Sequence, residues 1–213
     1  MNLFNSHAGS NKEKQNTLRQ IANARNEPDQ AAIKFARQKG WLNDGSLAQF
    51  NLEKANLEKV DLRGANLKGS NLTDAMLAGA DLWQANLEGA ELRSANLTGA
   101  YLGGANLKDT DLSNATLDGA QLGGAKLARA RLVNVNLRNA FLFGAHLNGA
   151  VLDAVDLTGA TLEFANLQEA TLGVVNLNGA TYNAQTIWPD GFEPRGTGAI
   201  FMDDPAKHLI ERP

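Results

Sequence analysis

Leucine recurs at every fifth position of this chain from Leu47 to Leu177, which gives 27 leucines in register. The residue two places before each leucine is nearly always small, as at Ala55, Ala85 and Ala125. An α-helix turns about 100° per residue, so this spacing would scatter the leucines around its circumference. In a straight strand the odd spacing would alternate them between two faces. The repeat therefore predicts short extended steps with a bend in every unit, so that all leucines turn inward.

Glycine often stands two places after a leucine, where such a bend would fall, as at Gly79 and Gly99. Units such as Ala55-Asn56-Leu57 and Ala95-Asn96-Leu97 resemble those of pentapeptide-repeat proteins, most of all cyanobacterial members. The resemblance covers roughly residues 46–187. It implies an all-β solenoid, a right-handed quadrilateral β-helix with four units per coil, in which 27 units make about seven coils.

The chain is expected to divide into three parts: a polar segment and helical cap (1–43), the β-helix (44–187), and a closing segment with a loose tail (188–213). Between residues 11 and 40, apolar residues at helical spacing form two groups separated by Asn26-Glu27-Pro28. This predicts a short helical pair that covers the open strand edges of the first coil. A partner-binding module is the alternative. The predicted cap residues are Leu18, Ile21, Phe35, Trp41 and Phe50.

The repeat gives out after Thr181, where Tyr182 and Ile187 are expected to replace leucine. A second group of large apolar residues is predicted to close the last coil; its members are Tyr182, Ile187, Trp188 and Phe192. The remaining tail, with Gly196, Gly198 and Pro205, is expected to be loosely held.

No arrangement of residues in the sequence indicates catalysis, and we expect no enzyme activity, cofactor, metal or small-molecule substrate. The chain has no cysteine, and its histidines, His7, His146 and His208, lie far apart. Gly103-Gly104 and Gly123-Gly124 lack the lysine and following helix of a phosphate loop. The net charge of −3 gives no reason to expect nucleic acid or a membrane surface as partner. The chain has no secretory leader-like stretch, and we expect a cytoplasmic protein.

Four units per coil place leucines 20 residues apart on one side of the rod, which sorts the outward residues into four faces. The face that carries Leu62, Leu82 and Leu102 also holds all five outward aromatic residues of the repeat region. Chance would place all five on one face in about one case in 250. Its only basic residue is predicted to be Arg63. The aromatic residues of this predicted partner-binding surface are Trp83, Tyr101, Phe141, Phe143 and Phe164.

An apolar stripe between ordinary charged faces is typical of an association surface. We therefore expect a non-enzymatic interaction or scaffold module that binds a protein partner, or itself as a homodimer, through this face. One alternative, implied by the resemblance, is a DNA mimic that modulates a type II topoisomerase. It calls for a strongly negative rod, whereas lysine and arginine interrupt every face here. Another alternative is a spacer module of a longer protein.

Overall fold

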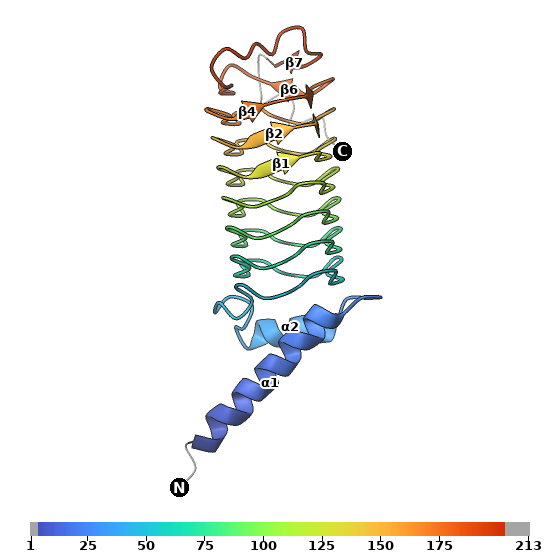
Figure 1. Cartoon of the computed structure of the whole chain (residues 1–213), viewed down its shortest axis with the longest axis vertical. Helices are drawn as coiled ribbons and strands as arrows, with labels where there is room; N and C mark the ends of the chain where they lie inside the picture. Colours follow the sequence, from blue (N-terminus) through green and yellow to red (C-terminus); the bar gives the residue numbers. More distant parts are fainter. Residues whose placement is uncertain (1–3, 203–213) are drawn as a thin grey trace.

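A computed structural model of the protein describes residues 4–202, which form a rod of stacked coils with two helices at one end (Figure 1). Helix α1 spans Phe4–Asn23 and helix α2 spans Gln30–Gln38. The sequence predicts a short helical pair between residues 11 and 40, and α1 begins earlier than expected. Residues 12–15, where lysine, glutamate and glutamine favour a helix, continue α1 toward the N-terminus beyond its apolar residues Leu18 and Ile21.

The ends of α2 follow from its sequence. The side chain of Asp29 caps the first turn by accepting a hydrogen bond of 2.8 Å from the backbone N–H of Ala32. Beyond the last turn, Gly40 has a φ of +73°, a left-handed conformation that suits glycine. The Trp41 N–H then donates to the carbonyl oxygen of Ala36 at 2.9 Å. These bonds turn the chain toward the first coil.

Each five-residue unit of the rod is a short extended step followed by a tight turn. In one such turn, the Ala55 N–H donates to the Leu52 carbonyl oxygen at 3.0 Å, and Lys54 has a φ of +57°. A positive φ at this place is the mark of a type II turn. Asparagine before leucine adds a second brace, because Asn51 Oδ1 accepts a hydrogen bond of 3.0 Å from the Glu53 N–H. The Ala-Asn-Leu pattern therefore stabilises the turn of each unit as well as filling the core.

Successive coils are joined by parallel backbone pairing between residues twenty apart, as in Asn51 with Asn71 and Asn71 with Glu91. Where the pairing lengthens, residues 4–202 form seven short strands: β1 (Arg131–Val133), β2 (Val151–Asp153), β3 (Val155–Asp156), β4 (Thr171–Leu172), β5 (Val175–Asn176), β6 (Thr181–Tyr182) and β7 (Ile200–Phe201). They pair in the orders β1-β2-β4, β3-β5 and β6-β7, all parallel. Twenty residues at five per unit give four sides to each coil.

The leucines fill the inside of the rod. Every leucine of the repeat is buried except Leu172, which is half-buried near the C-terminal end. At the other end, the helices cover the first coil: Leu18, Ile21 and Trp41 are buried, and Phe35 and Phe50 pack against the same core. The backbone edge is covered as well, since the Asn56 N–H donates to the Ala24 carbonyl oxygen at 2.7 Å.

The C-terminal end corrects one expectation. Ile187 does not stand in a leucine place, because it pairs with Asn166, one residue more than the usual twenty away. The additional residue shifts the register, so that Thr186 turns inward and Ile187 is 47% exposed. Tyr182 is buried as expected, and Trp188 and Phe192 pack against the core.

The tail is also more ordered than the sequence suggests. Ile200–Phe201 forms β7 on top of β6, and the ring of Phe201 lies 5.4 Å from that of Tyr182. Gly196 and Gly198 have φ values of +87° and +88°, which let the chain turn back toward the rod. The part of the predicted loose tail beyond Met202, which includes Pro205, lies outside the described residues.

Candidate protein-interaction surface

One side of the rod carries all five residues of the predicted aromatic surface. Backbone pairing links Asp81 to Tyr101, Tyr101 to Gln121, Gln121 to Phe141 and Phe141 to Thr161, so these residues form one ladder along the rod. Trp83, Phe143 and Phe164 belong to the turns on the same side. We call this side the aromatic face. Trp83, Tyr101 and Phe164 are 51%, 54% and 39% exposed, so their rings contribute to the surface.

Three of these rings form a continuous group, which we call the aromatic cluster: Phe141, Phe143 and Phe164. The Phe141 and Phe143 rings are stacked with centroids 5.8 Å apart. The Phe143 and Phe164 rings are tilted by 49° at 4.9 Å. Such pairs contribute about 0.5–1.5 kcal/mol beyond their buried area. Trp83 and Tyr101 lie nearer the helices, and no ring contact joins them to the cluster within residues 4–202.

The glycines of this face support the rings. A Cβ atom on Gly103 would lie 3.1 Å from Cδ1 of Trp83, and one on Gly123 would lie 3.1 Å from Cε1 of Phe141. Each of the two rings therefore leans onto the backbone of a neighbouring coil, which only glycine leaves open to this degree. Aromatic rings thus lie over both glycines.

Phe164 has a φ of +62°, the left-handed conformation of the turn. Glycine occupies this place in many other units and other residues occupy it in several, as at Lys54 and Ala154. A bulky aromatic residue there is strained by about 1–3 kcal/mol. The turn nevertheless presents a phenylalanine against Phe143. A residue held at such a cost to folding is more informative about function than one that the fold prefers.

Glu163 lies on the same face, and the sequence interpretation overlooked it. Its side chain is 1% exposed, and Oε2 has no hydrogen-bond partner. Three other buried polar atoms near this end of the rod also lack one: Oγ1 of Thr181, Nδ2 of Asn183 and Nε1 of Trp188. The sequence does contain a signal for Glu163. Along this face, the residues that directly follow leucine at intervals of twenty form a row of four apolar residues that ends in a single carboxyl: Trp83, Gly103, Gly123, Phe143 and Glu163.

The end of the face nearest the helices is polar. Arg63 forms ion pairs with Asp61 at 2.8 Å and Asp81 at 3.5 Å, and Arg37 of α2 reaches Asp61 at 2.9 Å. The hydrogen bond from Arg63 lowers the pKa of Asp61, and the same pairing raises the pKa of Arg63. Arg63, predicted to be the only basic residue of this face, is thus neutralised by its neighbours.

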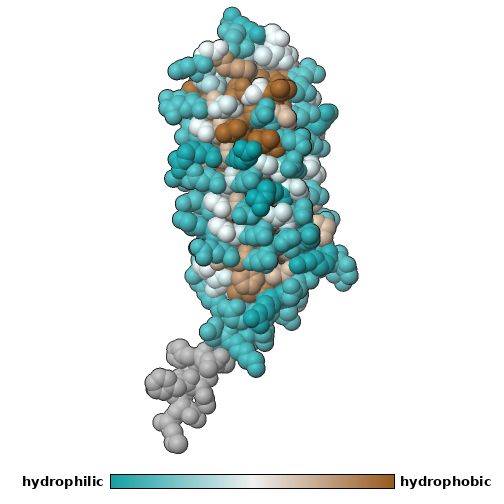
Figure 2. Space-filling view, viewed as in Figure 1, coloured by the Kyte–Doolittle hydropathy of each residue, from teal (hydrophilic) through white to brown (hydrophobic). Residues whose placement is uncertain are grey.

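The opposite side of the rod, which carries β1, β2 and β4, is charged near the helices and apolar near the C-terminal end. Arg93 pairs with Glu91 at 2.6 Å and with Asp111 at 3.4 Å. Val174 is 75% exposed, and Val133 and Val151 are half-buried. Figure 2 shows apolar patches on the visible side at the level of these strands. The sequence did not predict this apolar group of valines.

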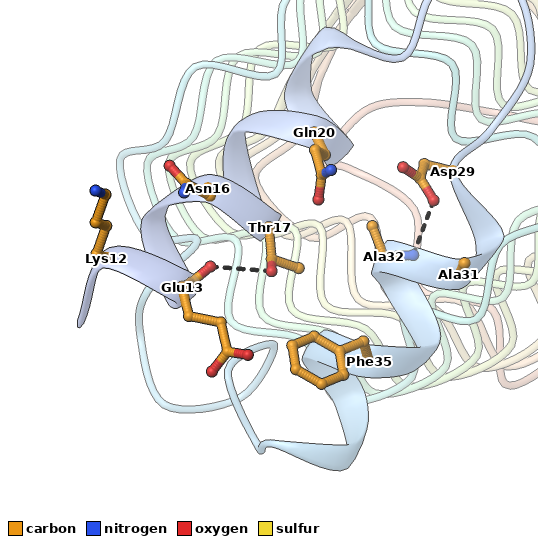
Figure 3. Close-up of a pocket in the computed structure, with 9 residues that line it drawn as sticks. All are labelled: Lys12, Glu13, Asn16, Thr17, Gln20, Asp29, Ala31, Ala32 and Phe35. Carbon is orange, nitrogen blue, oxygen red and sulfur yellow. Dashed lines mark hydrogen bonds between the residues drawn. The ribbon is translucent and has the colours of Figure 1, made fainter. Parts of the chain in front are cut away.

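A groove of about 630 Å³ lies between α1 and α2 (Figure 3). Six of its nine lining residues are polar. Two of them already form hydrogen bonds within the helices: Thr17 Oγ1 donates to the Glu13 carbonyl oxygen at 3.0 Å, and Asp29 caps α2. Phe35 forms one wall. Within residues 4–202, no group of three or more histidine, cysteine, aspartate or glutamate side chains could hold a metal ion. The groove thus offers neither a nucleophile with a base nor a set of metal ligands.

Comparison with known proteins identifies the class of protein. The profile of the pentapeptide-repeat family matches residues 42–74, 70–109, 105–142 and 142–173, which is more than half of the chain. The chain therefore belongs to the pentapeptide-repeat family, and its rod is a right-handed quadrilateral β-helix. Members of this family are generally non-catalytic. No curated protein sequence matches at a significant level.

Several solved structures are similar, and cyanobacterial proteins stand among them, as the sequence predicts. HetL, a pentapeptide-repeat protein involved in heterocyst differentiation regulation in Nostoc sp. strain PCC 7120, is 36% identical with a TM-score of 0.61. The match covers 71% of this chain and 64% of HetL, so the chain spans less than two thirds of that protein.

Two further matches are less extensive. Rfr23 of Cyanothece 51142 is 29% identical over 51% of this chain and 63% of its own, with a TM-score of 0.31. A protein of the Arabidopsis thaliana thylakoid lumen is 30% identical over 44% of this chain and 66% of its own, with a TM-score of 0.43. In the part of the chain that the structure describes, no helix is long and apolar enough to cross a membrane.

Proposed function

We propose that this protein is a non-enzymatic interaction or scaffold module that binds a protein partner, or a second copy of itself, through the aromatic face. The observation that carries the proposal is the gathering of all five outward aromatic residues of the repeat on one side, with three of them in mutual contact. Aromatic residues dominate the energetics of protein interfaces because they bury large areas with little loss of conformational freedom.

The strained turn at Phe164 supports the same proposal. Folding alone would favour glycine at a φ of +62°, so the phenylalanine is better explained by what its exposed ring contacts. The neutralised arginine and aspartates at the helical end would form a polar rim beside the apolar cluster, as is usual at interfaces.

The test compares the two sides of the rod. We would immobilise the wild type, the aromatic-face variant Phe141→Ser/Phe143→Ser and the opposite-side control Val133→Ser/Val151→Ser, and identify proteins retained from a lysate of the native host by mass spectrometry. Light scattering on each purified protein reports self-association. We expect the aromatic-face variant alone to lose a retained protein or the dimer.

Two outcomes would contradict the proposal. A monomer in all three proteins with nothing retained would leave the aromatic face without a partner. Equal retention by all three proteins would place the interaction elsewhere on the rod. Circular dichroism of each variant must match that of the wild type, so that a loss of binding is separated from a loss of folding.

The DNA-mimic function remains the alternative proposal, and the charge pattern disfavours it. Several acidic side chains on the outside are paired with basic ones, as Asp109 is with Arg129 at 2.8 Å and Glu88 is with Lys68 at 3.0 Å. A DNA mimic needs unpaired negative charge to replace the phosphates. If this protein leaves supercoiling by purified gyrase unchanged, the DNA-mimic function is excluded. A spacer role and the cytoplasmic location are predictions from the sequence alone.

A further inference from the structure

The two ends of the aromatic face carry groups that can pair with each other between molecules. At the helical end, the Arg63 side chain is 56% exposed, and its side-chain hydrogen bonds within residues 4–202 use Nε and Nη2 but not Nη1. In the units of this face beyond Asp81, Glu163 is the only charged residue, and its Oε2 has no partner. The face therefore has a spare cationic donor at one end and a spare acceptor at the other.

Two copies of this face can meet around a twofold axis that runs parallel to the strands. Such an axis reverses the direction of the rod but keeps the direction of the strands, so each residue faces a residue at the same place of a unit in the other copy. With the axis between the coils of Leu102 and Leu122, those two coils face each other, and the coils on either side pair in the same order: Leu82 with Leu142 and Leu62 with Leu162.

This register brings groups of matching chemistry together. Arg63 of each copy faces Glu163 of the other, so opposite charges meet twice in the dimer. Trp83 of each copy faces Phe143 of the other, and their rings can stack across the interface. The Glu163 side chain, 1% exposed in the single chain, has to turn outward to reach Arg63. The turn exchanges an enclosed oxygen without a partner for a hydrogen bond between charged groups.

The same register also matches the shapes of the two surfaces. Phe164, the bulky residue in a left-handed turn, faces Gly64, which has no side chain to collide with the ring. Near the axis, Tyr101 is 54% exposed and faces a coil whose outward residues are Gln121 and two glycines. Large residues of one copy therefore find room on the other.

Neighbouring registers lose the pairing of charges. If the axis moves by one coil toward the helices, Glu163 faces Asn43 of the other copy. If it moves by one coil the other way, Glu163 faces Trp83. In neither case does Arg63 face a carboxylate of the other copy. Charge complementarity thus selects one register among the three.

We propose that two copies of this protein form an antiparallel dimer through their aromatic faces, with Arg63 of each copy against Glu163 of the other and Trp83 against Phe143. The proposal rests on the proposed function and deepens it, because it names a second copy as the occupant of this face. A parallel arrangement would instead bring the two Glu163 side chains to the same end of the interface, where their charges repel.

The size of the face sets the strength of the dimer. At about 200 Å² for a whole aromatic side chain, the exposed parts of Trp83, Tyr101 and Phe164 offer about 290 Å² on each copy. Two copies bury about 580 Å² through these rings, to which Gln121 and the charged ends add, whereas stable interfaces bury about 1,200–2,000 Å². We therefore expect a weak dimer, with a dissociation constant of about 10–100 µM.

Exchange of the two charges tests the register. Arg63→Glu places two carboxylates in each contact and Glu163→Arg places two guanidinium groups there, so each variant alone should dimerise at least tenfold more weakly than the wild type. In an equimolar mixture, both contacts of a mixed dimer regain opposite charges. Sedimentation velocity over a concentration series should then give a dissociation constant within threefold of the wild type. Native mass spectrometry, with a heavy-isotope label on one variant, identifies the mixed dimer.

The matched control makes the same exchange on the opposite side of the rod. Arg93→Glu and Asp153→Arg also change residues that directly follow a leucine, and they should leave the dissociation constant within twofold, alone or mixed. A mixture of Arg63→Glu and Glu163→Arg that dimerises no better than either variant would overturn the proposal. So would a wild type that stays monomeric up to about 1 mM.

Cross-linking gives a second test that does not depend on the folding of Glu163→Arg. The chain has no cysteine, and the two copies of residue 121 would lie about 11 Å apart, from about 10 Å between the faces and about 5 Å along the rod. A short bismaleimide should therefore link Gln121→Cys at least tenfold faster than Arg131→Cys, which has the same place of the unit on the opposite side. Adding Arg63→Glu should slow the Gln121→Cys reaction to the control rate. Equal rates for the two cysteine variants would overturn the proposal.

The outcomes separate this proposal from the proposed function. A monomeric wild type whose retained lysate protein is lost by Phe141→Ser/Phe143→Ser would support the function and overturn the second copy as occupant. A dimer that this variant loses but the charge exchange leaves unchanged would support the function and overturn the register. A dimer that both sets of variants leave intact, with no other protein retained, would contradict the proposal and the function together.

Discussion

The aromatic face and the opposite side of the rod have the same backbone and the same interior but different exteriors. Apart from the unit of half-buried Leu172 on the opposite side, both consist of five-residue units with a buried leucine, and both include turns of positive φ, as at Phe164 and Ala154. One exterior gathers Trp83, Tyr101 and three phenylalanines, and the other carries the Arg93 ion pairs and exposed Val174. Because folding constrains the two sides equally, their difference reflects what each side contacts.

The largest expected effect concerns the shared interior. Leu122→Ala on the aromatic face and Leu132→Ala on the opposite side should each lower the free energy of unfolding by about 2–5 kcal/mol, since both leucines are fully enclosed and leave a cavity. Denaturant unfolding of the two variants measures this. Losses that differ by more than about 1 kcal/mol would show that the two interiors are not equivalent.

The next effect compares two acidic residues, Glu163 and Asp153, each of which directly follows the leucine of its unit. Glu163→Leu should raise the free energy of unfolding by about 1–3 kcal/mol, because it removes a buried carboxylate with an unpaired oxygen. Asp153→Leu on the opposite side should give no gain, because exposed Asp153 accepts a hydrogen bond of 3.1 Å from the Val174 N–H. Thermal and denaturant unfolding would compare them, and a destabilised Glu163→Leu variant would contradict the expectation.

A smaller effect concerns turn strain. Ala154→Gly on the opposite side, where φ is +53°, should stabilise the rod by about 1 kcal/mol because glycine accepts this conformation. Phe164→Gly relieves the same strain but loses the ring contact with Phe143, so its net change should stay within about 1 kcal/mol. Partner retention should nevertheless fall for Phe164→Gly alone. Equal gains in stability for both variants would mean that the ring contact contributes nothing.

The smallest effect concerns the ion pairs at the polar end of the aromatic face. The pKa of Asp61 is lowered in the folded state, so its contribution to stability is present above the unfolded pKa of about 3.9 and is lost as the pH falls through the folded value. Because Asp61 is partly exposed and screened by solvent, Asp61→Asn should cost at most about 1 kcal/mol at pH 7. The difference should shrink as the pH falls and vanish once the Asp61 carboxyl is protonated in the folded protein. A loss that persists in acid would point to another cause.

The sequence was sufficient for most of the fold, because a five-residue leucine period fits few other structures. It also sorted the aromatic residues onto one side, since four units per coil turn residue number into position. It failed at Ile187, where one additional residue shifts the register and the leucine rule gives the wrong side. It also missed Glu163, because a carboxyl on an outward position reads as solvated until its neighbours are known to enclose it.

By itself, the sequence determined the stacked coils, the inward leucines and the side of the rod on which each outward residue stands, because the repeat is a local rule that every unit obeys. Only the tertiary structure decided which outward side chains touch. The contact of Phe143 with Phe164, the ring of Trp83 over Gly103 and the enclosure of Glu163 depend on contacts between units far apart in the chain. Such contacts follow from the stacking of coils, which no single unit encodes.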